Sequence, residues 1–461
     1  MTEKKDLKNR KVQIAVYGGM FIISAIFYLI WYWHDGIILT EDAPSYINMQ
    51  SDREPGYCSF LWILRFFFGG DIYLHVAVIL QCLLAALAAC NLTFSLQKRF
   101  KFHWFWMICI LFIQYGMTIL NRFIAQRRYS YYNSIETEGL AYSLWIFFFL
   151  SILGILYDKN RKSIIAAIIW SIVLISIRKQ MMITLILIFF CIFAMRLCEK
   201  RKWYKGLLEA IVIVVIIMFG TNLVDCTYNF ATRGVFSKHT GDSSFILGTE
   251  LYLTDISKAE LIEDEDNREI FLEIMKRADD NQYNIAYAGS GWHNIEDHYS
   301  NSYDRIKFDI VNVVVREYQD EKGIPQELRD DNYQKIAGAL MKELLPSCIP
   351  NLIKLFFCNV IHGLITTVLK VHPVLNWMAL FIYVAYILLF VWLVGRKSYQ
   401  KVSVSALPFA AVTILAILSN VGLTSMTIYC QMRYMLYNTA LFYQAGLLML
   451  LEMWNVIRKK D

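Results

Sequence analysis

The stretch GIILTEDAPSYINMQSDREPGYCSF, residues 36–60, lies between two long apolar segments and decides how the rest of the chain is interpreted. It combines Arg53, Tyr46 and Tyr57 with four acids, which are Glu41, Asp42, Asp52 and Glu54. Acids and an arginine crowded at a membrane surface are expensive unless they have a function. An ordinary solvated loop is the alternative, and residue types alone do not separate the two readings.

The composition predicts an all-α, polytopic membrane protein. Of the 461 residues, 57% are hydrophobic, and they fall in runs of the ~20 residues that a helix needs to cross a bilayer. The net charge of +6 does not indicate nucleic-acid binding, because the basic residues cluster at the ends of apolar runs, where they set orientation. The ten cysteines have irregular spacing and form no C-x-x-C pair, so neither a metal nor a cofactor is expected.

The basic residues also predict a topology of about ten spans. The N-terminus, MTEKKDLKNRK, precedes the first span and is expected in the cytoplasm, which puts the loop after that span outside. The segment 349–371 is apolar but contains Lys354 and His362, and counting it as a span would put RKSYQK on the wrong side, so we expect an interfacial or re-entrant helix there. The spans are expected at about 12–33, 72–92, 104–120, 140–157, 163–177, 181–197, 207–224, 374–395, 402–423 and 435–457.

Three parts follow from this topology. Residues 1–224 form an N-terminal transmembrane module that carries the first outer loop. Residues 225–348 are acidic and polar, too long for a structureless loop, and predict a mixed extracytoplasmic insert whose apolar residues recur at helical spacing. Residues 349–461 hold the interfacial helix and the last spans.

The expected outer face carries more cations than the positive-inside rule allows. A guanidinium fork is suited to phosphate, so we predict a lipid phosphate held at this face. The alternative is that single arginines reach out to anionic headgroups, which applies least to Arg178 because it lies between two apolar runs. The seven cations are Arg53, Arg122, Arg127, Arg128, Arg178, Lys179 and Arg433.

Asp42 is the candidate general base. A carboxylate that faces such a phosphate can take the proton of a hydroxyl or amine as that group attacks a sugar carbon, while guanidinium groups stabilise the leaving phosphate. Glu138 opens the fourth span and could line the same pocket, although an acid in the first helical turn is also an ordinary helix start. The other candidates for the base are Glu41, Asp52 and Glu54.

Six short segments follow one another in a fixed order relative to the spans. They are D-x-x-x-Y (Asp42–Tyr46), R-E-P-G-Y (Arg53–Tyr57), Gln81, T-E-G-L-A (Thr137–Ala141), Arg178 at the RKQ turn, and RYMLY (Arg433–Tyr437). In this order they resemble the glycosyltransferase C superfamily, and most of all its bacterial family 39-like branch, related to protein O-mannosyltransferases and aminoarabinose transferases. The resemblance covers about the first two hundred residues and is diffuse beyond them.

The resemblance implies a glycosyltransferase C-like bundle with an inverting transferase site on the outer face. It implies Asp42 as the catalytic base, and Arg53 and Arg178 as contacts of the donor phosphate. Cys58 and Lys179 stand where this family often has proline, and the first loop lacks a D-x-D metal motif, which fits a metal-independent branch.

Residues and resemblance together predict one site. Asp42 is its base, and its phosphate-binding residues are Arg53, Arg178, Lys179 and Arg433. The residues expected to line the pocket are Glu41, Tyr46, Glu54, Tyr57, Arg127, Arg128 and Glu138.

The predicted function is transfer of a sugar from a polyprenyl-phosphate donor to an extracytoplasmic acceptor, a glycan, lipid or protein, by an enzyme of the bacterial cytoplasmic membrane. Membrane lipids are expected partners and nucleic acid is not. One alternative is an exopolysaccharide polymerase that uses lipid-diphosphate oligosaccharides. The other is a lipid-linked sugar flippase or transporter, for which charges buried mid-span and symmetry-related broken helices would be expected.

Overall fold

The computed structural model describes residues 2–123, 129–199, 202–239, 242–369 and 376–458. Arg127 and Arg128, two of the predicted pocket residues, lie outside these ranges. Within them the chain is helical and holds no β-strand, and its single bridge joins Ile38 to Ser134.

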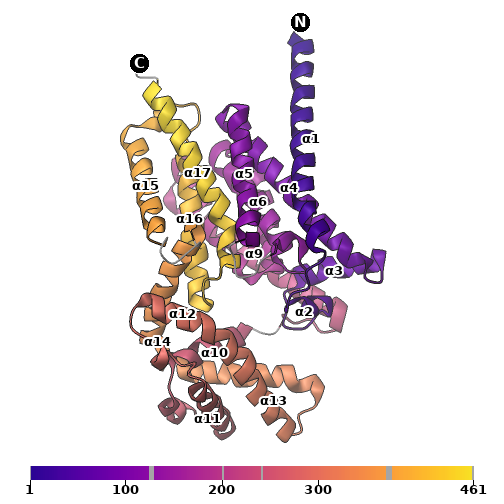
Figure 1. Ribbon diagram of the computed structural model, residues 1–461, viewed down its shortest axis with the longest axis vertical. Coiled ribbons are helices and arrows are strands. Elements are labelled where there is room, and N and C mark those ends of the chain that lie inside the picture. The colour runs from indigo at the N-terminus through magenta and orange to yellow at the C-terminus, as the bar shows by residue number, and fades with distance from the viewer. Residues whose placement is uncertain (1, 124–128, 200–201, 240–241, 370–375, 459–461) are drawn as a thin grey trace.

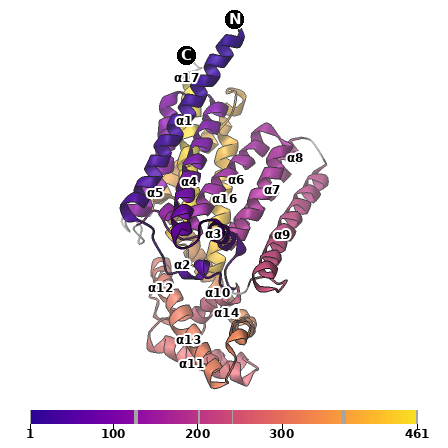
Figure 2. The same cartoon turned by 90° about the vertical axis from the view of Figure 1, so that its right-hand side faces the viewer.

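Ten helices of the described ranges are long and apolar enough to cross a membrane, as expected for a polytopic helical membrane protein. Both termini lie at one end of the bundle, and the helices of the insert lie at the other (Figures 1 and 2). The ten are α1 (Thr2–Asp35), α4 (Ile72–Phe100), α5 (Trp104–Phe123), α6 (Glu138–Asp158), α8 (Ile183–Cys198), α9 (Trp203–Arg233), α14 (Arg329–Leu369), α15 (Asn376–Gly395), α16 (Leu407–Thr427) and α17 (Met432–Arg458).

These ten helices differ from the ten spans predicted from the sequence in two places. The expected span at 163–177 is α7 (Arg161–Ile177), an apolar helix whose 17 residues are at the short end of the ~17–25 that a crossing helix has. The expected helix at 349–371 is not a separate element, because its described residues form the last part of α14, a 41-residue helix that begins in the insert. The carbonyls of Thr367 and Val368 accept hydrogen bonds from Thr439 and Tyr443, so the end of α14 lies along α17.

Buried apolar residues form two cores, one in the bundle and one in the insert. The core of the insert runs from Leu247 to Cys358 and therefore continues into α14. Its described elements are helical although a mixed insert was expected, and the apolar positions that recur at helical spacing, such as Ile270 and Ile274, are buried in it. The described elements of the insert before α14 are α10 (Asp242–Leu253), η3 (Ile256–Leu261), α11 (Glu265–Asp280), η4 (Ile285–Tyr287), α12 (Trp292–Asp304), η5 (Arg305–Val311), α13 (Asn312–Glu321) and η6 (Gln326–Leu328).

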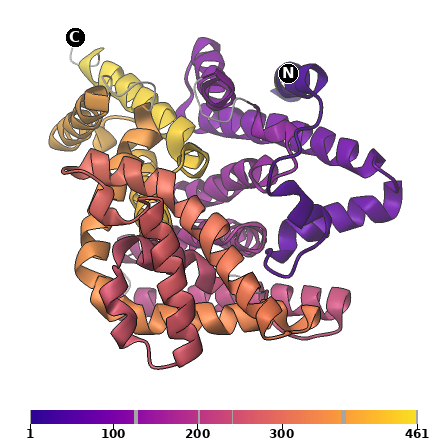
Figure 3. The ribbon, with the colours of Figure 1, turned by 60° about the horizontal axis from the view of Figure 1, so that its bottom comes forward.

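The connections at the insert end of the bundle carry the predicted site. The first loop holds α2 (Ala43–Ile47) and leads into α3 (Pro55–Phe68), the loop before α6 holds η1 (Tyr131–Asn133), and η2 (Lys179–Met182) joins α7 to α8. Figure 3, turned to bring the insert forward, shows the insert in front of the C-terminal helices, with the N-terminal helices beside it.

Candidate active site

A close approach at Gly56 joins the first loop to the RKQ turn. A Cβ atom at Gly56 would lie 2.7 Å from the carbonyl carbon and oxygen of Ser176, so only glycine lets the start of α3 lie this close to the end of α7. Beside it, the backbone N–H of Lys179 donates to Oε1 of Glu54 at 3.2 Å. The R-E-P-G-Y segment and Arg178 are therefore neighbours in space.

Gln81 of α4 ties together two further connections. Its Oε1 accepts from the Tyr57 hydroxyl at 2.9 Å, and its Nε2 donates to the carbonyls of Tyr132 and Ser134 at 3.1 and 3.0 Å. A Cβ atom at Gly139 would lie 2.5 Å from Nε2 of Gln81, so the glycine of T-E-G-L-A makes room for this amide. Tyr57, a predicted pocket residue, is buried and has this structural role.

Asp42 lies between two arginines from opposite ends of the chain. Nη2 of Arg53 donates to its Oδ1 at 2.9 Å, and Nη1 of Arg433, at the start of α17, approaches its Oδ2 at 3.4 Å. The guanidinium of Arg53 also lies 4.9 Å from the centre of the Tyr46 ring, a cation–π contact that fixes the arginine. Burial raises the pKa of the Tyr46 phenol, which therefore stays protonated at neutral pH.

A second ion pair lies beside the first. Nη1 of Arg178 is 2.5 Å from Oε1 of Glu138 and 2.9 Å from the Thr137 hydroxyl. The same oxygen of Glu138 lies 3.9 Å from Nε of Arg433, so Arg433 interacts with both carboxylates. Glu138 thus pairs with the arginines in addition to standing in the first turn of α6.

Tyr434 and Gln180 belong to the site although they were not predicted from the sequence. The guanidinium groups of Arg178 and Arg433 lie 4.8 and 4.9 Å from the centre of the Tyr434 ring. Gln180 accepts from Nε of Arg178 at 3.1 Å and donates to the Tyr434 carbonyl at 3.1 Å. Both lie in segments that the sequence had singled out, Gln180 in the RKQ turn and Tyr434 in RYMLY, but neither was assigned a role there.

The remaining predicted residues lie outside this cluster or support it. The side chain of Glu54 accepts from the RKQ turn, and Lys179 provides the backbone donor of that bond. Glu41 is exposed and forms no ion pair with a described residue. Arg122 pairs with Asp35 at 2.8 Å and is not in the cluster.

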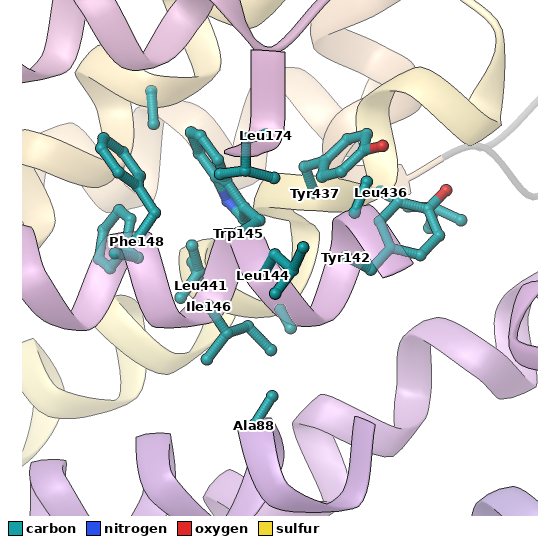
Figure 4. Close-up of a cluster of buried hydrophobic side chains, with 14 of the residues drawn as sticks. Ala88, Tyr142, Leu144, Trp145, Ile146, Phe148, Leu174, Leu436, Tyr437 and Leu441 are labelled. Atoms are coloured by element: carbon teal, nitrogen blue, oxygen red, sulfur yellow. The ribbon is translucent and has the colours of Figure 1, made fainter. Parts of the chain in front are cut away.

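Exposure distinguishes the two carboxylates of the cluster. The Asp42 side chain is 30% exposed and that of Glu138 is 2% exposed, so Asp42 can meet a ligand while Glu138 holds the arginines. Farther along α6 from Glu138 the side chains are apolar and buried: Figure 4 shows Trp145 with Leu174 and Leu441 near it. Charge interactions are stronger beside such a dry core than in water.

The described ranges contain no group of three or more His, Cys, Asp or Glu side chains arranged to hold a metal ion. His298, one of two histidines in the insert segment GSGWHNIEDH, is hydrogen-bonded to the Tyr252 hydroxyl at 3.2 Å and the Gln282 carbonyl at 3.0 Å. No protein-family model, curated protein or solved structure matches this chain, so sequence and geometry carry the functional argument.

Proposed function

We propose that this chain is an integral-membrane glycosyltransferase that moves a sugar from a polyprenyl-phosphate donor to an acceptor at the outer face. One observation carries the proposal: the partly exposed carboxylate of Asp42 lies between Arg53 and Arg433, with Arg178 alongside. A carboxylate suited to act as a general base and guanidinium groups suited to bind an anion thus lie together at one end of the bundle, which supports a lipid phosphate bound near the headgroups.

The proposed step exchanges one bond at the anomeric carbon. The acceptor oxygen or nitrogen bonds to this carbon, the bond from carbon to phosphate oxygen breaks, and the polyprenyl phosphate leaves with that electron pair. Asp42 takes the acceptor proton, and the guanidinium groups stabilise the charge that grows on the phosphate. A phosphate that draws Arg53 and Arg433 toward itself also makes Asp42 more basic, because the carboxylate loses part of its counter-charge.

An apolar cavity supports a lipid-linked donor. It has a volume of about 680 Å³ and is lined by residues of α5, α15 and α17. Its lining on α17 begins at Thr439, six residues after Arg433, which is ~9 Å along the helix axis. Ala440 and Leu447 also line it, and their seven-residue spacing from Arg433 puts them on the same face of α17. An isoprenoid chain could lie here with its phosphate near the arginines.

The charge pattern supports an outer-face site. The basic N-terminal segment lies at the end of the bundle opposite the insert, and such segments favour the cytoplasm. The cluster at the insert end then faces outside, which fits a sugar donor that its polyprenyl-phosphate group anchors in the membrane.

The first test compares wild type with Asp42→Asn and Asp71→Asn, using membranes and a panel of labelled polyprenyl-phosphate sugars. We expect Asp42→Asn to lower transfer by about a hundredfold or more while it still binds donor, because the amide cannot accept the proton. Asp71 precedes α4 and is exposed, so Asp71→Asn should transfer at the wild-type rate. Equal transfer by Asp42→Asn would exclude Asp42 as base. Transfer only from diphosphate-linked oligosaccharides would favour a polymerase, and no transfer from any donor would contradict the proposal.

A further inference from the structure

A chain of two amide groups joins the RKQ turn to the beginning of α17. Nε2 of Gln180 donates to Oδ1 of Asn420, on α16, at 2.7 Å, and it also lies 3.3 Å from the Thr424 hydroxyl. Nδ2 of Asn420 in turn donates to the Tyr434 carbonyl at 2.7 Å, which Nε2 of Gln180 approaches at 3.1 Å. Three elements that are far apart in the sequence therefore meet through these two side chains.

Arg178 sets the direction of the hydrogen bonds in this chain. Its Nε donates to Oε1 of Gln180 at 3.1 Å, and because a guanidinium can only donate, the oxygen of that amide must face the arginine. The nitrogen of Gln180 then faces Asn420, whose oxygen accepts, and the nitrogen of Asn420 is left for the Tyr434 carbonyl. A flip of either amide would set two donors against each other. Both amides are therefore oriented by the charge of Arg178.

The far end of the chain lies beside a second arginine. Tyr434 directly follows Arg433, and Nη2 of Arg433 donates to the Tyr434 hydroxyl at 2.9 Å. The guanidinium groups of Arg178 and Arg433 also share the ring of Tyr434, and both lie near Oε1 of Glu138. The amide chain joins Arg178 to the backbone next to Arg433, so neutral hydrogen bonds help Glu138 to determine how far apart the two arginines lie.

Another amide pair in the bundle shows what a purely structural pair looks like. Nε2 of Gln444, on α17, donates to Oε1 of Gln114, on α5, at 3.3 Å and to the Ile110 carbonyl at 3.1 Å. That pair joins two spans through groups that carry no charge. Asn420 is buried as deeply, at 1% exposed, and polar groups inside a span are expensive, but its chain of hydrogen bonds leads to an arginine.

We propose that Gln180 and Asn420 are positioning residues for the donor phosphate, which hold Arg178 and Arg433 at the separation at which both can donate to one phosphate group. This inference rests on the proposed polyprenyl-phosphate donor. Neither amide needs to touch the phosphate, because each acts through the arginines. Binding groups that are fixed in advance lose less conformational freedom when the ligand arrives, so the fixed pair should bind a phosphate more tightly than arginines that can separate.

The test measures binding of two ligands to the purified full-length protein in detergent, a long-chain polyprenyl monophosphate and the corresponding uncharged polyprenol. Wild type should bind the monophosphate more tightly, because the polyprenol offers the arginines no charge. Gln180→Met and Asn420→Leu should each raise Kd for the monophosphate about tenfold and leave Kd for the polyprenol unchanged. A residue that only packs helices together would not distinguish the two ligands.

A double variant and a matched control complete the test. The protein that carries both Gln180→Met and Asn420→Leu should show no higher Kd for the monophosphate than the weaker-binding single variant, because the two amides act through one chain of hydrogen bonds. Gln114→Met breaks the structural amide pair of α5 and α17. It should leave both Kd values unchanged, even where the melting temperature of the protein falls.

Each other result would overturn the inference. Wild-type Kd for the monophosphate in both single variants would show that the amides do not position the arginines. An equal loss for both ligands, or the same loss in Gln114→Met, would show general damage to the bundle, and changes that multiply in the double variant would show two separate roles. Wild type that binds the monophosphate no more tightly than the polyprenol would refute the donor class itself, and the inference with it. Gln180 is only half-buried, so Gln180→Met remains a test should Asn420→Leu fail to fold.

Discussion

Gln81 shows how much of the site depends on one uncharged side chain. Its amide joins α4, the first loop and the connection before α6 through three hydrogen bonds. Glu138, which follows that connection, pairs with Arg178, so the position of the arginine depends on this amide as well. Gly139 alone provides the space for it.

We therefore expect Gly139→Ala to destabilise the protein by about 1–3 kcal/mol, the usual cost of overpacking, and to lower sugar transfer. The added methyl group would displace Gln81, which its three hydrogen bonds prevent from moving away. Gly422→Ala, on α16, is the matched control, since a Cβ atom there meets nothing within 4 Å, and alanine favours a helix by about 1 kcal/mol. Melting curves in detergent would check both, and a Gly139→Ala protein as stable as Gly422→Ala would contradict the packing argument.

The sequence predicted the charged residues of the cluster better than the uncharged ones. The structure brings together Asp42, Arg53, Arg178 and Arg433, which the charge pattern and the resemblance had singled out. Gln180 and Tyr434 were given no role, because neither is charged and only the fold brings them against Arg178. They are hydrogen-bonded to each other across 254 positions of the sequence.

At the scale of elements, α14 explains the main departure from the predicted spans. The positions of the basic residues predicted that its apolar end is a separate interfacial helix, whereas α14 continues from the insert through Pro346 and Pro350. Leu340 and Leu344 bury the first part of it in the core of the insert, and Leu355 lies in the same core. The sequence shows the apolar run, but packing against both the core of the insert and the bundle decides where the helix begins.

The packing of α10 on α14 buries a carboxyl group at Glu250, and this predicts a pH effect. The side chain is fully buried, neither of its oxygens has a hydrogen-bond partner among the described residues, and burial raises its pKa from 4.5 to about 8. The folded state thus holds this proton more tightly than the unfolded state. The contribution of this proton to the free energy of unfolding is therefore fully present below pH 4.5. It is lost as pH rises toward 8, by up to about 1.4 kcal/mol per pH unit.

Glu250→Gln should remove that loss, because the amide cannot ionise. The variant and wild type should be equally stable near pH 4.5, and the variant should be increasingly the more stable of the two up to pH 8. Glu260→Gln changes an exposed acid of the insert and should show no such trend. Thermal unfolding across this pH range would measure the difference, and a constant offset between Glu250→Gln and wild type would contradict ionisation as its cause.

At the scale of the whole molecule, the two cores meet beside the candidate site. The core of the bundle includes Tyr46, Tyr437 and other residues around the arginines, and the core of the insert includes Ile306 and Ile310 of η5. The two meet at Ile428 and Tyr429, which pack against the core of the insert just before α17 begins. A movement of the insert would therefore reach Arg433 through only a few residues.

This arrangement requires the insert to face outside, which thiol labelling in intact cells can test. Glu321 ends α13 in the insert and Gln400 lies between α15 and α16, and both are exposed. The native Cys198 is exposed as well, so the substitutions belong in a Cys198→Ser background. A membrane-impermeant maleimide should label Glu321→Cys in intact cells and Gln400→Cys only after permeabilisation, because the two positions lie beyond opposite ends of the bundle. The reverse pattern would put Asp42 and the arginines at the cytoplasmic face, where an extracytoplasmic acceptor could not reach them, and equal labelling of both positions would contradict the bundle topology itself.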